Sequence, residues 1–332
     1  MESIDNQIVV SIQCLTYNHA PYIRQCLDGF VMQKTSFYFE AIVHDDASTD
    51  GTQDIIREYE KKYPNIIKPI YQKENQYSKS KHGNITNLIS SKCKGKYIAI
   101  CEGDDYWTDP YKLQKQVDYL ESHPKCGMCY SNFSKYNQKY RTFSHNCLKK
   151  EQVQKYNNLH DWIKLTPYAG PMTWLYRRDV MSSRPSFNTI DGSFVTFSYF
   201  LAESKVHCLF EDNTAVYRVL EDSASHSRDI TKQYKYKKGI HDIQLQLIEY
   251  YKYKIIDSNE LITEINQKYY RRFLFHIIAN GNQQELEKAI NYSDKSWPFS
   301  KRLLAKFAKN KLLSGLIKRF IKEYLINNNK IK

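Results

Sequence analysis

The sequence lacks the long hydrophobic segments of a membrane-spanning protein. Its 332 residues are 41% apolar and 26% charged, and no apolar run approaches the roughly 20 residues that a transmembrane helix needs. Residues 1–5 also lack the basic and apolar regions of a secretory signal peptide. We therefore expect a cytoplasmic globular protein with one large or two modest domains.

A second cysteine pair, which a zinc site would need, is also missing. Cys126 and Cys129 fit a Cys-x-x-Cys pattern, but no other pair accompanies them. They lie in an expected strand, where alternation sends successive side chains to opposite faces. Most of the eight cysteines lie in apolar segments, so we expect reduced core residues.

Acidic residues are scarce at the end of the sequence. Residues 301–332 contain one acid, Glu323, against ten lysines and arginines. The net charge of +13 would suit a nucleic-acid ligand, but much of the excess lies after residue 230 instead of being spread along the chain. We therefore expect no nucleic-acid partner.

Strand-like and helix-like segments alternate through the first hundred residues. Continuous, β-branched apolar runs predict buried strands at 7–16, 37–44, 66–71 and 96–101. Helices are expected between them, at 22–33, 52–63 and 84–93. This β-α-β-α-β-α-β order with short connections predicts an α/β fold, with a mostly parallel sheet covered on both faces by helices.

Two of the expected strands end in acidic loops. Asp45 and Asp46 follow one strand, and Glu102, Asp104 and Asp105 follow another. The carboxyl ends of parallel strands lie at one edge of a sheet, where ligands bind in this fold class. Crowded carboxylates repel one another unless a cation or hydrogen-bond donors compensate them, and Mg²⁺ and similar hard ions prefer oxygen ligands. The pattern favours a metal site that receives a phosphorylated ligand.

An acidic turn that caps the next helix is the alternative. Asp109 and Pro110 can begin a helix at Tyr111, and carboxylates near that point would then be structural. The occurrence of two acidic loops at the same sheet edge favours the ligand site.

Three motifs, taken in order, resemble the nucleotide-binding half of family 2 glycosyltransferases. They occupy residues 12–18, 44–52 and 102–107. The resemblance covers roughly residues 7–135 and continues more weakly to about 228. It implies a GT-A fold, which is Rossmann-like with a mostly parallel sheet flanked by helices, and transfer of a sugar from a nucleotide diphosphate with inversion.

The resemblance also implies a domain organisation. We expect a GT-A domain over 1–230, with a nucleotide-binding half at 1–125 and an acceptor half at 126–230. A helical, basic C-terminal region follows at 231–332.

The family's nucleotide-binding positions can be assigned to residues of this chain. Thr16 and Tyr17 would line the nucleotide pocket. Asp45 would hydrogen-bond the base, usually uracil, and Asp46 would support that loop or the ribose.

The family's Asp-x-Asp motif falls on Glu102, Gly103 and Asp104. Asp104 would bind Mn²⁺ or Mg²⁺ directly, and Glu102 would reach the ribose, or the metal through water. Glutamate in place of aspartate adds one methylene, which could move the cation or hold it less tightly. Asp105 would contact the substrate or cap the following helix.

The acceptor hydroxyl needs a carboxylate base within hydrogen-bond reach. Asp191 is the candidate, although the spacing places the family's carboxylate nearer Ser193 or Phe194. Either the loop is longer in this chain or the usual base is missing. As an alternative, Asp191 is an N-cap or turn residue beside Gly192.

Two further residues have both a substrate role and a structural alternative. Trp174 could stack on a sugar ring, or it could be a buried aromatic in a strand. His226 could reach the diphosphate from a C-terminal loop, or it could belong to a solvated loop.

The basic C-terminal region has helical periodicity. Helices are expected at 240–253 and 261–280, and residues 301–325 alternate apolar and basic positions at helical spacing. A basic amphipathic helix suits contact with the inner membrane surface. Packing against its own domain, or in a homodimer, explains the pattern equally well.

The function expected from these features is metal-dependent, inverting sugar transfer in surface-polysaccharide synthesis. The expected donor is a UDP-sugar, and the acceptor is a glycan or is lipid-linked. The alternative is a non-catalytic nucleotide-sugar-binding assembly protein. A nucleotidyltransferase is disfavoured because the turn at 16–21 lacks the glycine-rich loop of that class.

Overall fold

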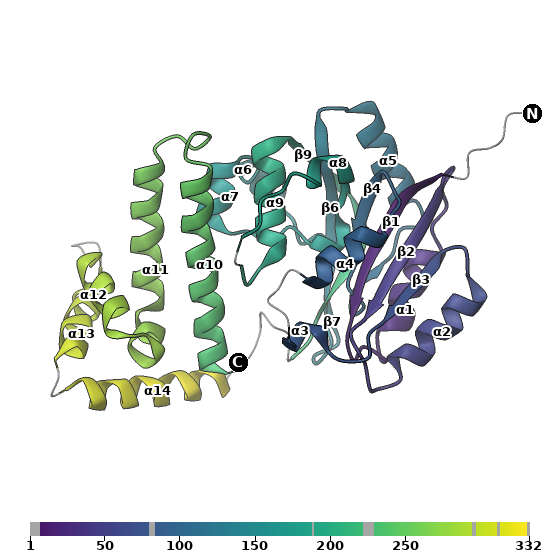
Figure 1. Cartoon of the computed structure of the whole chain (residues 1–332). Helices are drawn as coiled ribbons and strands as arrows, with labels where there is room; N and C mark the ends of the chain where they lie inside the picture. The colour runs from purple at the N-terminus through teal and green to yellow at the C-terminus, as the bar shows by residue number, and fades with distance from the viewer. Residues whose placement is uncertain are drawn as a thin grey trace, which may run out of the picture. The chain divides into compact units, whose positions relative to one another are not determined.

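A computed structural model describes residues 7–79, 84–187, 189–221, 229–293, 297–310 and 313–330 (Figure 1). The chain divides into two compact units. The first, which we call the sheet unit, comprises Met1–Asn188 and Thr196–Val219. The second, the helical unit, comprises Thr189–Val195 and Leu220–Lys332.

The sheet unit is organised around a nine-stranded sheet of described residues, in the order β3-β2-β1-β4-β8-β6-β9-β5 with β7 paired to β6. Its first four strands are the predicted ones and pair in parallel. They are β1 (Ile8–Thr16), β2 (Tyr38–Asp45), β3 (Ile67–Tyr71) and β4 (Tyr97–Ile100). Most residues of β1 and β2 are buried, which explains their continuous apolar sequence.

The helices between these strands pack on the sheet. They are α1 (Ile23–Val31), α2 (Thr52–Lys62), α3 (Gln76–Lys79) and α4 (Asn84–Lys92). α1 buries Ile23, Cys26, Leu27 and Phe30, which recur at helical spacing. The predicted βα alternation is therefore confirmed, with α3 as an additional short turn of helix.

Beyond β4 the sheet becomes mixed. β8 pairs antiparallel with both β4 and β6, whereas the long strand β9 runs parallel to β6. The strands here are β5 (Tyr106–Trp107), β6 (Cys126–Asn137), β7 (Thr142–Ser144), β8 (Leu175–Arg177) and β9 (Lys205–Val219). The helical elements are α5 (Lys112–Ser122), α6 (Lys150–Lys155), α7 (Leu159–Leu165), η1 (Pro171–Thr173), α8 (Arg178–Met181) and α9 (Gly192–Glu203).

The helical unit consists mainly of α10 (Ile230–Tyr250) packed against α11 (Ser258–Asn280). Three shorter helices, α12 (Gln283–Asn291), α13 (Phe299–Lys309) and α14 (Ser314–Lys330), pack on and around α11 (Figure 1). The helix predicted at 240–253 corresponds to α10, which begins ten residues earlier, at Ile230. Asp229 caps its start by accepting hydrogen bonds from Thr231 N and Lys232 N. Within the described ranges, no helix has the length and hydrophobicity needed to cross a membrane.

The cysteines are free thiols, and six of the eight are buried, including Cys126 and Cys129. This confirms the expectation of reduced core residues.

Lys112, at the start of α5, is a cation enclosed in the core of the sheet unit. Its Nζ donates to Gln116 Oε1 at 2.6 Å and lies 4.3 Å from the centre of the Trp107 ring. Burial lowers the pKa of Lys112 to about 7, against the weaker opposing effect of Cys129, Cys101 and Asp109.

We expect this lysine to make stability depend on pH. Between pH 7 and 10.5 the unfolded chain holds a proton on Lys112 that the folded chain releases, so stability rises with pH across this window. The contribution is at most about 1.4 kcal/mol per pH unit. Denaturant unfolding of the wild type and Lys112→Met at several pH values should show a difference in unfolding free energy that moves in favour of the wild type as pH rises.

The exposed Lys61→Met variant is the control, and its difference from the wild type should stay constant. A constant difference for Lys112→Met as well would contradict the assignment.

Candidate active site

The predicted acidic loops meet at the carboxyl edge of the parallel strands. Thr16 and Asp45 are register partners at the ends of β1 and β2. Asp46 N donates to Thr16 O at 3.0 Å, and Gly103 N donates to Leu15 O at 2.8 Å. The loop after β4 is thereby bonded to the end of β1. This is expected, because β2, β1 and β4 pair in parallel and end at the same edge of the sheet.

The loops after β1 and β2 are also tied to each other by side chains. Asn18 N donates to Ser48 Oγ, and Thr49 N donates back to Asn18 Oδ1. Asp50 Oδ2 accepts from Ala20 N. These bonds hold the turn after β1 in one conformation, with Asn18 in the left-handed region at a φ of 54°, which asparagine tolerates.

Asp45 is fully buried and only half satisfied. Its Oδ1 accepts from Ser48 N at 3.0 Å and from Gln53 Nε2 at 2.6 Å, whereas its Oδ2 has no hydrogen-bond partner within the part of the chain described. Thr16 Oγ1 and His19 Nδ1 are likewise buried and unpartnered in that part. Buried polar atoms are normally paired, so three unpaired ones at one sheet edge mark a place for a polar ligand.

Asp46 has a structural task. Its two carboxylate oxygens accept from Gln76 N at 2.7 Å and Tyr77 N at 2.9 Å, and they thereby hold the start of α3 beside the site. Tyr17, by contrast, is exposed at the edge of the same region.

Gly103 is required by close packing. A Cβ at this position would lie 2.7 Å from Thr16 Oγ1 and 3.0 Å from His19 Nδ1. Burial lowers the pKa of His19, and the nearby Asp104, Asp50 and Asp45 oppose this shift. His19 is a site residue that the sequence analysis missed, because only the fold brings the turn after β1 onto Gly103.

The three carboxylates after β4 differ in burial. Glu102 is exposed, Asp104 is half-buried, and Asp105 is buried. Burial raises the pKa of Asp105, and the charges of Asp104 and Glu102 raise it further. Asp105 does not cap α5, since its Oδ1 accepts from Arg218 N at 2.8 Å; Asp109 Oδ1 instead accepts from Tyr111 N at 2.8 Å.

Arg218, near the end of β9, supports this loop from the other half of the sheet unit. Its Nε donates to Asp104 O at 2.8 Å, and its guanidinium also donates to Gln25 and Gln138. The guanidinium lies between 4.9 and 5.7 Å from the ring centres of Tyr22, Tyr106 and Tyr136. Arg218 is not predictable from the sequence, because a single cation in a strand gives no indication of partners more than a hundred residues away.

Asp104 and Glu102 suit a divalent cation that is shared with a ligand. The described residues contain no group of three or more His, Cys, Asp or Glu side chains that could hold a metal ion by themselves. Mg²⁺ is commonly bound by one or two carboxylates together with substrate phosphates. The hard oxygen donors present therefore fit such an ion when a diphosphate supplies further ligands.

Asp191 lies in the helical unit, where its carboxylate is fully engaged. Oδ1 accepts from Phe194 N at 3.0 Å and Ser193 Oγ at 2.6 Å, as an N-cap of α9 does. Oδ2 accepts from Tyr236 Oη at 3.1 Å. Asp191 thus has the N-cap geometry that the sequence left open as an alternative to the role of base.

Trp174 lies in the core of the sheet unit. Its Nε1 donates to Ala169 O at 3.0 Å, and its ring packs against Phe197. It is 1% exposed, so Trp174 is a buried core residue, the structural alternative that the sequence left open. His226 falls outside the described residues.

A family model for glycosyl transferase family 2 matches residues 11–184, just over half of the sequence. The chain belongs to glycosyltransferase family 2. It is 48% identical over 121 residues to an uncharacterized protein of Mycobacterium tuberculosis, a match that covers 36% of this chain and 34% of that protein.

Two further relatives have more informative names. TuaG of Bacillus subtilis, named as a glycosyltransferase of teichuronic acid biosynthesis, is 31% identical over 126 residues, covering 38% of this chain and 47% of TuaG. The Escherichia coli glucosyltransferase WfaP is named for UDP-Glc and α-D-GlcNAc-diphosphoundecaprenol. It is 34% identical over 125 residues, a match that covers 38% of this chain and 46% of WfaP. The matches span only a third to a half of these relatives.

Solved structures confirm the expected GT-A fold with a helical C-terminal extension. Residues 1–349 of Staphylococcus aureus TarS, solved with UDP-GlcNAc, match with a TM-score of 0.58 and 16% identity, covering 95% of this chain and 91% of that one. The Pyrobaculum calidifontis mannosyltransferase PcManGT, solved with GDP-Man and Mn²⁺, matches with a TM-score of 0.51 and 16% identity. The match covers 96% of this chain and 85% of PcManGT. At these identities the likeness is one of fold.

The packing at Gly103 leads to a prediction about stability. Gly103→Ala should lower the unfolding free energy by about 1–3 kcal/mol, because the new methyl group overpacks Thr16 and His19. Gly315→Ala is the matched control, since a Cβ at that helical position meets nothing within 4 Å. Denaturant unfolding of both variants tests this, and equal effects would contradict the packing argument.

Proposed function

We propose that this protein transfers a sugar, with inversion, from a UDP-sugar to a glycan or lipid-linked acceptor in surface-polysaccharide synthesis. The proposal rests on three buried atoms that have no hydrogen-bond partner among the described residues: Asp45 Oδ2, Thr16 Oγ1 and His19 Nδ1. They lie beside the loop that carries Glu102 and Asp104. Asp45 Oδ2 can accept the ring N–H of uracil, while Thr16 and Tyr17 line the pocket.

The donor and acceptor classes rest on the relatives' names. TarS was solved with UDP-GlcNAc, and the name of WfaP gives it a UDP-sugar donor and a lipid diphosphate acceptor. TuaG is named for a surface polysaccharide. We propose the same classes here, with a nucleotide-binding half at 1–125, an acceptor half at 126–230 and a helical region from 231.

Glu102 and Asp104 would hold Mn²⁺ or Mg²⁺. What the cation supplies when bound is neutralisation of the charge that develops on the departing diphosphate. The chain's own contribution is to hold the Asp104 carboxylate at the end of β4, through the hydrogen bond from Arg218 Nε to Asp104 O. Asp105, buried under the loop and bonded to Arg218 N, keeps that turn in place.

Asp191 is the proposed general base for the acceptor hydroxyl. Its hydrogen bonds from Phe194 N, Ser193 Oγ and Tyr236 Oη fix the orientation of the carboxylate. An oriented carboxylate can take the proton of an attacking hydroxyl that comes within hydrogen-bond reach.

We further propose that the protein works on the cytoplasmic side of the inner membrane, with residues 301–325 in contact with the membrane surface. A homodimer through the same helices is the competing use of this segment.

One alternative function has specific support. Glu102 stands where the family has aspartate, and both oxygens of Asp191 are engaged in the fold. These features suit a protein that binds a nucleotide sugar in an assembly without turnover.

Calorimetric titration with UDP, GDP and CDP, with and without Mn²⁺, tests the donor site. We expect Mn²⁺-dependent binding of UDP, reduced about tenfold or more in Asp104→Ala because the cation loses a direct ligand. Asp54→Ala, with a side chain 83% exposed, should bind like the wild type. Absence of binding to all three nucleotides would refute the donor site, and binding without any UDP-sugar hydrolysis or transfer would favour the assembly protein.

Replacement of Arg218 should raise the cation requirement. Arg218→Lys keeps the charge but loses the planar donor set that reaches Asp104 O, Gln25 and Gln138. We expect the Mn²⁺ concentration for half-maximal UDP binding to rise about tenfold, since displaced ligands commonly cost that much in metal affinity. Loss of thermal stability with an unchanged Mn²⁺ requirement would limit Arg218 to a structural role.

A further inference from the structure

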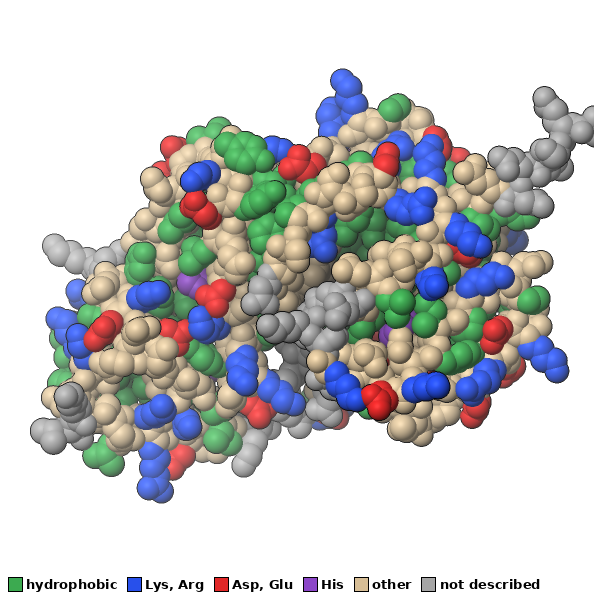
Figure 2. Space-filling model, in the orientation of Figure 1, with side chains coloured by type: hydrophobic (Ala, Val, Ile, Leu, Met, Phe, Trp, Pro, Cys, Tyr) green, Lys and Arg blue, Asp and Glu red, His purple; other side chains and the backbone are tan. Residues whose placement is uncertain are grey.

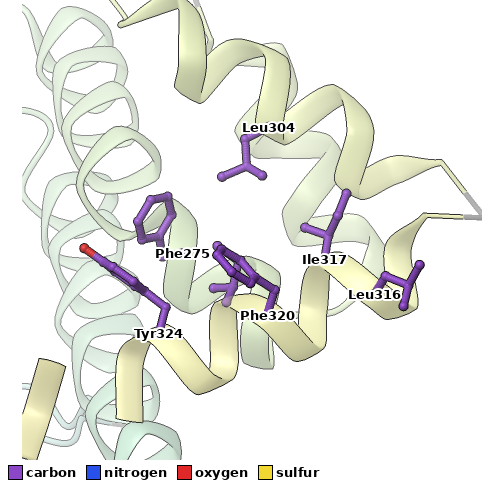
Figure 3. Close-up of a pocket in the computed structure, with 7 residues that line it drawn as sticks. Phe275, Leu304, Leu316, Ile317, Phe320 and Tyr324 are labelled. Carbon is purple, nitrogen blue, oxygen red and sulfur yellow. The ribbon is translucent and has the colours of Figure 1, made fainter. Parts of the chain in front are cut away.

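The helical unit contains an apolar groove at the junction of α11, α13 and α14. Figure 3 shows side chains from these helices gathered around one space, with Leu316 at its outer end. The groove has a volume of about 520 Å³. Every lining side chain is aliphatic or aromatic: Phe275, Leu304, Leu316, Ile317, Phe320, Ile321 and Tyr324. Its only side-chain polar group is the Tyr324 hydroxyl, so the lining offers few hydrogen-bond partners to a polar ligand and suits a hydrocarbon occupant.

The rim of the groove leaves large apolar side chains in water. Leu316 and Phe320 on α14 are 71% and 68% exposed, and Tyr324 continues the row at the next turn. On α13, Phe299, Leu303 and Phe307 form a second exposed row with the same four-residue spacing. Exposed apolar rows of this size on two helices that contact each other indicate a surface that is covered in use.

The charge on these two helices indicates what covers it. Residues 297–310 and 313–330 contain one acid, Glu323, against eight cations: Lys301, Arg302, Lys306, Lys309, Lys318, Arg319, Lys322 and Lys330. Glu323 is itself paired with Arg319 at 3.2 Å. Figure 2 shows lysine and arginine side chains beside hydrophobic ones over these helices. A second copy of the chain would bring like charges together, whereas an anionic bilayer attracts them.

We propose that α13 and α14 dock on an anionic lipid bilayer and that the groove takes up an acyl chain of one of its lipids. Leu316, Phe320 and Tyr324 contact the hydrocarbon, and the exposed lysines and arginines contact the phosphate headgroups. This inference rests on the membrane location proposed above and adds the site, the lipid class and the mode of contact. It does not depend on donor binding.

Co-sedimentation of the full chain with lipid vesicles tests the docking. We expect binding to phosphatidylglycerol-containing vesicles that weakens as salt is raised, and little binding to pure phosphatidylcholine. Lys318→Glu and Lys322→Glu should each weaken binding roughly fivefold or more. The double variant Leu316→Ser/Phe320→Ser should weaken it about tenfold or more.

Ile256→Ser is the matched control, because Ile256 is 82% exposed in the turn between α10 and α11. It should bind vesicles like the wild type, and all these variants should keep wild-type UDP binding. A negative result in the vesicle experiment can therefore be distinguished from a negative result in the UDP-binding experiment.

Insertion of an acyl chain has its own measurement. Brominated acyl chains should quench the fluorescence of the tryptophan introduced by Phe320→Trp. They should not quench that of the tryptophan introduced by Ile256→Trp. Three outcomes would overturn the proposal: no binding to anionic vesicles, binding that the groove variants leave unchanged, or a lipid-free dimer that Leu316→Ser/Phe320→Ser dissociates, which would assign the groove to a second copy.

Discussion

Parallel pairing of β2, β1 and β4 is the constraint on which the proposed donor site depends. Because the three strands run in the same direction and are adjacent, their carboxyl ends bring Thr16, Asp45 and Asp104 to one edge. The hydrogen bond from Gly103 N to Leu15 O leaves no space for a side chain at residue 103. The spacing of the acidic groups therefore follows from the backbone register, and the side chains have little freedom to change it.

The second half of the sheet unit supports this edge. β9 pairs with β5 next to the acidic loop, and Arg218 of β9 holds the carbonyl of Asp104 while its own N–H satisfies Asp105. Burying a carboxylate among other carboxylates is costly, and a neighbouring guanidinium with several hydrogen bonds offsets that cost. The geometry of the acidic loop after β4 is thus built partly by residues far from it in the sequence.

The helical unit follows a different physical rule. α10 and α11 bury the aromatic and aliphatic side chains around Tyr269, Leu274 and Ile277, so their packed faces are conventional. α13 and α14 bury one side through Ala305, Ala308 and Ile321, and keep an apolar rim and a strongly basic surface exposed. A surface that is both apolar and basic is unfavourable in water alone and favourable at an anionic interface.

The sequence by itself determined the alternation of strands and helices, the acidic loops after β2 and β4, and the family, because these depend on local periodicity and short motifs. Only the tertiary structure decided that β9 returns beside β5 to place Arg218 on the acidic loop, that His19 lies against Gly103, and that Trp174 is packed against Phe197. It also decided that Asp191 caps α9 and accepts from Tyr236. These contacts join residues that are distant in the chain or whose local sequence allows two geometries, and packing chooses between them.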